Sequence, residues 1–235
     1  MKNSFRYSFG TLTLTGHKPF GGDNFLDALL ILSDDPGDKT GSHLWSGSLA
    51  LSYYIDCNSI FSKSSLPTPS LAYELGTGTG LVSMVLSKYF DLTIATDSDT
   101  VSLGLAQSNY SLNKSQLGAV SIESLSWGDS VDDLIQKYGR SSLVLGGDIL
   151  YDCSVIPLVF QTAKSLLDFG GMFIVSFVAR DGSQSKSKLR SAVINDCQEF
   201  GFSVKSCEIF SDFPRIDDEE EEVEIFIFEF SNPSF

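Results

Sequence analysis

With 235 residues and 42% hydrophobic side chains, the chain can bury one substantial core, and we expect a single domain. Its 16 Lys and Arg residues against 30 Asp and Glu residues give a net charge of −14, which repels phosphate backbones and excludes nucleic acid as an expected partner. The sequence has no apolar run long enough for a membrane span and no signal-peptide core, so no membrane partner is expected.

The cysteines show no Cys-x-x-Cys pairing, and only two histidines accompany them. A structural zinc site is therefore not expected, and we predict no metal. Scattered cysteines suit reduced thiols, which favours a cytoplasmic protein and is also compatible with the nucleus. We expect a monomer. The four cysteines are Cys57, Cys153, Cys197 and Cys207.

The residues up to position 70 predict a short N-terminal extension. Residues 7–15 have the pattern of a β-hairpin, residues 44–55 that of an apolar helix, and residues 59–70 that of a linker rich in Ser and Pro. We therefore divide the single domain into this extension, residues 1–70, and a core, residues 71–235.

A glycine-rich segment follows an apolar run at 71–73 and precedes a helical stretch from Leu81. Glycines let the backbone pass close to a ligand, and the N-terminus of the next helix offers free N–H groups. This layout predicts a nucleotide-type cofactor site after the first strand of a doubly wound sheet. A dinucleotide fingerprint needs a small residue where this chain has Leu81, so NAD fits poorly. The segment is Glu74-Leu75-Gly76-Thr77-Gly78-Thr79-Gly80.

From Gly76 onward strands alternate with helices, which predicts an α/β fold with a doubly wound, mostly parallel seven-stranded sheet. Asp99 is a candidate N-cap for the second helix of this core, and Gly170-Gly171 a stop signal for the fourth. The expected strands are 71–73, 92–97, 120–125, 143–145 and 172–178, and the expected helices 81–89, 100–113, 131–138, 155–167 and 186–200.

The last two strands, 203–210 and 223–230, follow each other without a helix, which predicts an antiparallel hairpin. In the second of them, Val and Ile alternate with Phe, so both faces are apolar. We expect this strand to lie inside the sheet and not at an edge. The acidic run 217–222 is expected to be the solvated tip of the hairpin, or alternatively to meet a basic substrate surface.

Several side chains near the expected carboxyl edge of the sheet are candidates for chemistry. Asp97 ends the second strand, where a carboxylate can accept both hydroxyls of a ribose. Asp148 and Tyr151 follow the fourth strand and can line the path of an acceptor; alternatively Asp148 caps the next helix and Tyr151 covers a loop. Trp45 begins the helix at 44–55 and Trp127 follows the third strand, and each either faces a cofactor or fills the core.

Together these segments resemble methyltransferase family 16, seven-strand class I enzymes that mostly methylate lysines in folded proteins. The resemblance covers roughly residues 45–178. It rests on the Trp45 segment, the glycine-rich segment, Asp97, Ser126-Trp127-Gly128, and the family's D-x-x-Y signature as Asp148-Ile149-Leu150-Tyr151.

This resemblance implies S-adenosylmethionine as the cofactor and a lysine of a protein, such as a translation factor, as the acceptor. It implies catalytic roles for Asp148 and Tyr151. Gly147 departs from the family pattern, in which alanine is commoner, and we expect the change to be tolerated. The cofactor-binding residues would be Trp45, Glu74, Gly76, Thr77, Gly78, Asp97, Trp127 and Gly147.

Other functions remain open from the sequence. A small-molecule N-methyltransferase would need a closed lid, and the N-terminal extension is short for one. A non-catalytic module that binds S-adenosylmethionine is disfavoured by the intact Gly76, Gly78, Asp97 and Asp148. An NAD oxidoreductase is disfavoured by Leu81.

Overall fold

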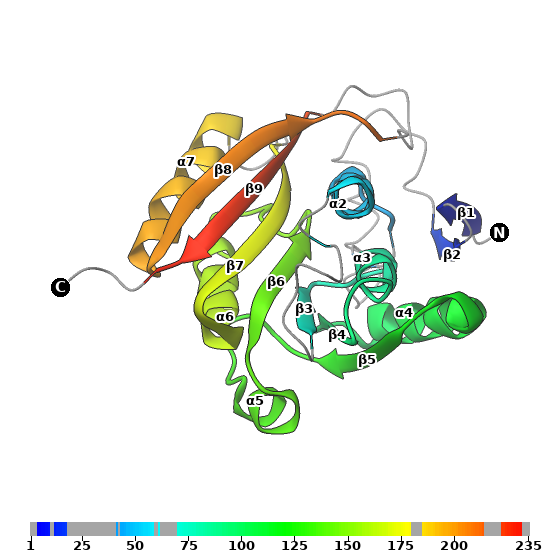
Figure 1. The fold of residues 1–235 in the computed structure, drawn as a ribbon. Coiled ribbons are helices and arrows are strands. Elements are labelled where there is room, and N and C mark those ends of the chain that lie inside the picture. The colour runs from blue at the N-terminus through cyan, green and yellow to red at the C-terminus, as the bar shows by residue number, and fades with distance from the viewer. Residues whose placement is uncertain are drawn as a thin grey trace.

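The computed structural model describes residues 4–9, 12–17, 41, 43–58, 61, 70–179, 185–213 and 222–231. A twisted seven-stranded sheet lies between helices on both of its faces, and a two-stranded hairpin stands beside it (Figure 1). The elements are β1 Ser4–Phe9, β2 Leu12–His17, α2 Ser46–Cys57, β3 Leu71–Leu75, α3 Leu81–Leu86, β4 Leu92–Asp97, α4 Thr100–Asn113, η5 Lys114–Gln116, β5 Ala119–Ser124, α5 Asp132–Tyr138, β6 Ser141–Gly147, α6 Ile156–Leu166, β7 Leu167–Val178, α7 Lys186–Glu199, β8 Phe202–Phe210 and β9 Val223–Phe230.

The sheet has the strand order β5-β4-β3-β6-β7-β9-β8. β3 pairs in parallel with β4 and β6, β4 with β5, and β6 with β7. β9 is antiparallel to both of its neighbours, β7 and β8. This arrangement confirms the predicted fold class, a doubly wound and mostly parallel sheet that ends in an antiparallel hairpin.

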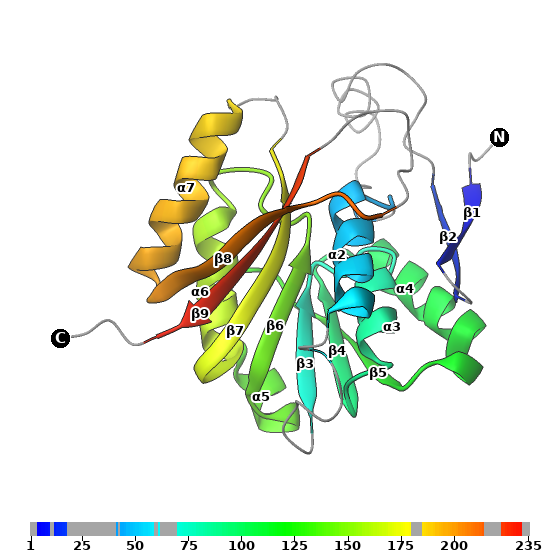
Figure 2. The ribbon, with the colours of Figure 1, turned by 45° about the horizontal axis from the view of Figure 1, so that its top comes forward.

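Two apolar cores lie on opposite faces of the sheet. α2, α3 and α4 cover one face, and α5, α6 and α7 cover the other (Figure 2). Because side chains alternate along a strand, β3 contributes Tyr73 to one core and Ala72 to the other. β9 does the same, with Phe226 and Phe228 on one side and Ile225 on the other. The prediction that this strand is buried on both faces inside the sheet is confirmed.

The predicted N-terminal hairpin is present as β1 and β2, which pair antiparallel, and β2 lies beside α4 (Figure 1). The predicted cap of α4 is also confirmed, since the Asp99 carboxylate accepts hydrogen bonds from the N–H groups of Val101 and Ser102. Most of the predicted linker 59–70, and the acidic run apart from Glu222, lie outside the described residues.

One predicted end signal is wrong. α6 ends at Leu166, one residue before the predicted end at 167, but Gly170 and Gly171, which were expected to be its stop signal, lie within β7. The chain is already extended at Leu167, the C-cap of α6, which has φ −84° and ψ 144°. No helix in the described part of the chain has the length and apolar character that crossing a membrane requires.

Candidate active site

The candidate residues gather where the strand order of the sheet reverses. From β3 the chain continues to β4 and β5 on one side, and then to β6 and β7 on the other. In doubly wound sheets, ligands bind in the crevice outside the carboxyl ends of the strands at such a point. The glycine loop follows β3, Asp97 ends β4, and Asp148 follows β6 directly, so three neighbouring strands bring their candidate residues to one edge.

The loop after β3 has the backbone conformation that its glycines predict. Gly76 has φ 65° and Gly78 has φ 51°, values that side chains disfavour. A Cβ atom on Gly76 would lie 3.0 Å from Cζ2 of Trp127, so the indole packs directly against the loop. The N–H of Thr77 donates to the carbonyl of Thr96 at 2.8 Å, which ties the loop to β4.

Glu74 lies beneath this loop with 1% of its surface exposed. Its Oε2 accepts hydrogen bonds from Thr77 Oγ1 at 2.6 Å, from the N–H of Ser83 at 2.9 Å, and from the Ser83 hydroxyl. Burial raises the pKa of Glu74 to about 7, against the opposing effect of these bonds. The carboxyl group therefore joins the loop to the first turn of α3.

Asp97 faces the same loop from the end of β4. Its Oδ2 accepts the N–H of Gly78 at 2.9 Å, and its Oδ1 accepts the N–H of Asp99 at 3.0 Å. Burial raises the pKa of Asp97 above its ordinary value, although both backbone bonds oppose this. Each carboxylate oxygen has a second lone pair, so the group has the capacity to accept further hydroxyl donors.

The aromatic candidates belong to two separate pairs of rings. The rings of Trp127 and Tyr151 are 6.3 Å apart, and Tyr151 is 54% exposed at the rim. Trp45 is the N-cap residue of α2, and its ring lies 5.8 Å from that of His43. The structure thus brings Trp127 to the glycine loop and Trp45 to the start of α2.

Asp148 has an unusual backbone and a carboxylate at a helix terminus. It is the one non-glycine residue with positive φ, 60°, in the described part of the chain, and it is 9% exposed. Its N–H donates to the Ser176 carbonyl at 3.2 Å and to Ser176 Oγ at 3.1 Å. Its Oδ2 accepts the N–H of Gly47, in the first turn of α2, at 3.4 Å. The Asp148 carboxylate therefore contacts the first turn of α2, and the N-cap residue of the following helix, α6, is Val155 and not Asp148 as in the alternative interpretation.

Gly147 also packs against α2. Its carbonyl accepts the Ser48 hydroxyl at 3.2 Å. A Cβ on Gly147 would lie 2.6 Å from Ser48 Oγ and 2.9 Å from Ser48 Cα. The first turn of α2 consequently sits directly on the end of β6.

The sequence interpretation missed four residues that shape this edge. Gly41 lies over the loop, since a Cβ on Gly78 would be 2.8 Å from its carbonyl oxygen. Gly47, Ser48 and Ser176 contact Gly147 or Asp148 from other elements. The only signal was positional, because Ser176 is the polar residue in the apolar strand 172–178.

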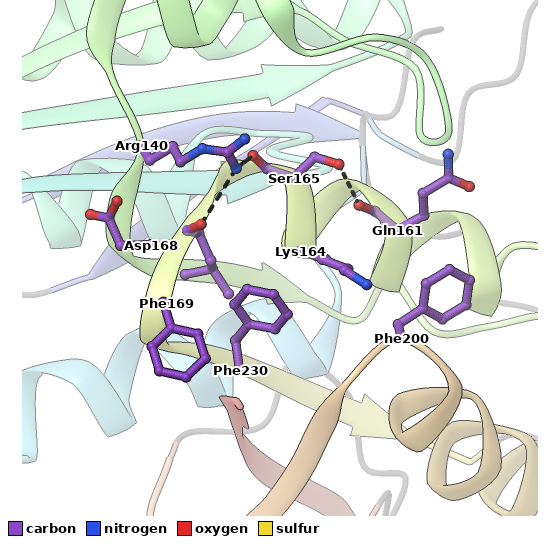
Figure 3. Close-up of a pocket in the computed structure, with 9 residues that line it drawn as sticks. Arg140, Gln161, Lys164, Ser165, Asp168, Phe169, Phe200 and Phe230 are labelled. Atoms are coloured by element: carbon purple, nitrogen blue, oxygen red, sulfur yellow. Dashed lines mark hydrogen bonds between the residues drawn. The ribbon is translucent and has the colours of Figure 1, made fainter. Parts of the chain in front are cut away.

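A surface pocket of about 580 Å³ lies at the opposite edge of the sheet, where α6 ends and β7 begins. Figure 3 shows Lys164, Phe169 and Phe230 around it, with Arg140 donating to the backbone of Ser165. This pocket contains none of the candidate residues. In the described residues, no group of three or more His, Cys, Asp or Glu side chains could hold a metal ion.

The fold is Rossmann-like, and solved methyltransferases share it. The crystal structure of magnesium protoporphyrin IX methyltransferase from Synechocystis, with bound S-adenosylmethionine, superposes with a TM-score of 0.57. The alignment covers 91% of this chain and 87% of that chain, at 16% identity.

The chain belongs to methyltransferase family 16, described as lysine methyltransferases, whose model matches residues 25–190. The protein-lysine N-methyltransferase EFM3 of Chaetomium thermophilum is 30% identical over 173 residues, 70% of this chain and 49% of that protein. EEF1A lysine methyltransferase 3 of Xenopus tropicalis is 36% identical over 93 residues, 40% of each chain. This chain thus spans about half or less of the length of these relatives.

Membership of this family implies S-adenosylmethionine as the cofactor, as predicted. The residues present fit it. Gly76 and Gly78 leave two positions of the loop without a side chain, Asp97 offers acceptors for sugar hydroxyls, and the Trp127 indole offers an apolar surface for a base.

Proposed function

We propose that this chain transfers a methyl group from S-adenosylmethionine to the side chain of a lysine in a protein substrate. One observation carries the proposal: a buried carboxylate, Asp148, is held at the carboxyl end of β6 beside the glycine loop of β3. Family membership supports it, as do relatives that are named lysine methyltransferases. The relative named for EEF1A supports a translation factor as the substrate.

In this proposal, residues at the ends of β3, β4 and β6 would hold the cofactor. Asp97 would accept its sugar hydroxyls, Trp127 would offer its ring to the base, and Thr77, Gly78 and Gly147 would bind it through their backbone. Trp45 closes the site from the start of α2, and Glu74 acts through the loop that it holds. When bound, S-adenosylmethionine supplies an electrophilic methyl group on its sulfonium.

Asp148 and Tyr151 steer and orient the lysine amine. A carboxylate attracts the lysine ammonium, and the exposed Tyr151 ring offers its face to the same cation. Asp148 also stabilises the charged amine and so raises the lysine pKa, which opposes the loss of the proton. We therefore assign Asp148 to orientation and not to proton removal. The proton leaves to water as the amine is desolvated.

The test is Asp148→Asn. Asn accepts the same hydrogen bond and tolerates a positive φ, so the fold is expected to survive where Ala would add strain. With radiolabelled methyl donor and cell extract, we expect labelling of protein to fall by about 100-fold or more. The Kd for S-adenosylmethionine in a calorimetric titration should stay within about twofold of the wild type.

Asp132→Asn, at the exposed start of α5, serves as the matched control and is expected to leave both quantities unchanged. Equal losses of labelling and cofactor affinity in Asp148→Asn would make Asp148 a cofactor ligand or a structural residue. A wild-type chain that methylates small amines but no protein would favour the small-molecule alternative instead.

A further inference from the structure

The conformation of Asp148 requires an explanation. A left-handed backbone is unfavourable for a residue with a side chain, and Asp148 adopts it with φ 60°. Such conformations persist only where the surrounding structure enforces them, and they cluster at functional sites. The groups that enforce this one come from β7 and α2.

Ser176 holds the backbone of Asp148 from the neighbouring strand. In the parallel pairing of β6 with β7, Ser176 is the partner of Gly147, the residue just before Asp148. The Asp148 N–H is shared between the Ser176 carbonyl at 3.2 Å and the Ser176 hydroxyl oxygen at 3.1 Å. Ser176 is completely buried, so water does not compete for this bond.

The first turn of α2 packs against both Asp148 and Ser176. A Cβ on Gly47 would lie 2.7 Å from Asp148 Cβ and 2.9 Å from Ser176 Oγ. The Gly47 N–H reaches the Asp148 carboxylate at 3.4 Å. Three elements therefore meet without free space, and a rotation of Asp148 would move the carboxylate away from the N-terminus of α2.

We propose that Ser176 is a positioning residue, whose hydroxyl holds Asp148 in the left-handed conformation that presents its carboxylate to the acceptor amine. This inference rests on the proposed function of Asp148. Removing the hydroxyl leaves the Asp148 N–H with the carbonyl alone. The strained backbone then relaxes, and the carboxylate loses its contact with Gly47.

Ser176→Ala tests this in the intact chain, with a methylated protein substrate and S-adenosylmethionine. We expect kcat to fall about tenfold or more, because small displacements of an orienting group are costly. KM for S-adenosylmethionine should stay within about twofold, since Ser176 accepts the N–H of Asp148, which the proposed function assigns to the acceptor amine and not to the cofactor. Ser176→Cys fills the same space with a weak acceptor, and kcat should fall there too.

Thr93→Val is the matched control. Thr93 is a fully buried hydroxyl on β4 with no hydrogen-bond partner among the described residues, and its removal should leave kcat unchanged. A kcat within about twofold of wild type in Ser176→Ala, or full activity in Ser176→Cys, would overturn the inference. A nearly unchanged kcat in Ser176→Ala would exclude a positioning role for the hydroxyl. Full activity in Ser176→Cys would show that Ser176 only fills space.

Crystal structures of wild type and Ser176→Ala provide a readout that does not depend on turnover. We expect Asp148 to keep its positive φ in the wild type and to lose it in the variant. A wild-type chain without any methyl transfer would contradict the proposed function. An unchanged Asp148 backbone in Ser176→Ala would contradict the inference alone.

Discussion

Glu74 shows how a single residue can place opposing demands on a site. Its Oε2 organises the glycine loop through Thr77 and Ser83, yet the group is almost fully buried. Burial penalises the ionised form, and the hydrogen-bond donors only partly offset this. The loop is therefore built around a carboxyl group whose pKa is close to neutral.

Because the pKa of Glu74 rises from 4.5 to about 7 on folding, the folded state binds this proton more tightly than the unfolded state. The stabilisation of the folded state by this bound proton is fully present below about pH 4.5 and is lost as the pH rises through about 7. Over that window the wild type should lose stability, on the order of 3 kcal/mol, relative to Glu74→Gln. Urea unfolding of both proteins at several pH values measures this difference.

Glu199→Gln, an exposed position at the end of α7, controls for the loss of one acidic residue. It should follow the pH dependence of the wild type. If the free energies of unfolding of the wild type and of Glu74→Gln change in parallel with pH, Glu74 does not titrate in this window.

Among the elements, α2 packs very closely against the sheet. Its first turn lies on the ends of β6 and β7, where Gly47 and Gly147 allow the two backbones to approach. The sequence interpretation treated Gly147 as a tolerated departure from alanine. In this chain Ser48 occupies the space that an alanine side chain would need.

Gly147→Ala is therefore expected to destabilise the fold by about 1–3 kcal/mol, because α2 must move away from β6. Denaturant unfolding measures the change. Gly104→Ala, in α4 where a new Cβ would have open space, is the control and should stabilise by up to about 1 kcal/mol. An unchanged free energy of unfolding in Gly147→Ala would mean that α2 adjusts without cost.

Patterning predicted most elements because apolar periodicity and local end signals agree with the final packing. β4 ends at Asp97 as expected, and β9 is interior because Phe226 and Ile225 require burial on opposite faces. The Gly170-Gly171 stop signal was mispredicted, since the chain becomes extended at Leu167, before both glycines.

The parts of the site that a single sequence segment forms could be predicted. The parts that depend on contacts between distant segments could not. The glycine loop and Asp97 follow from strand ends and turn chemistry alone. The left-handed backbone of Asp148 depends on Ser176 and Gly47, which are 28 and 101 residues away along the chain. No local pattern encodes those tertiary contacts.

At the scale of the whole molecule, net charge is the feature that bears on function. The 30 acidic residues outnumber the 16 basic ones, and a negative field of this kind attracts basic proteins and repels nucleic acid. Salt screens this long-range attraction, whereas it screens the buried contacts of the site much less.

We expect KM for a basic protein substrate to rise roughly three- to tenfold between about 50 and about 300 mM NaCl. Because salt screening slows the association of substrate with the enzyme, kcat at saturating substrate should change little. Steady-state kinetics across this range measures both constants, with the Kd for S-adenosylmethionine as the internal comparison. A KM that is independent of salt would show that the charge has no role in substrate capture.

The interior position of β9 has a consequence for the folding of the nascent chain. β9 is the last of the seven strands to leave the ribosome, yet it lies between β7 and β8. Until Val223–Phe230 has emerged, β7 lacks its antiparallel neighbour and its backbone groups form an open edge. This sheet therefore cannot close until β9 has been synthesised, and β7 keeps an open edge until then.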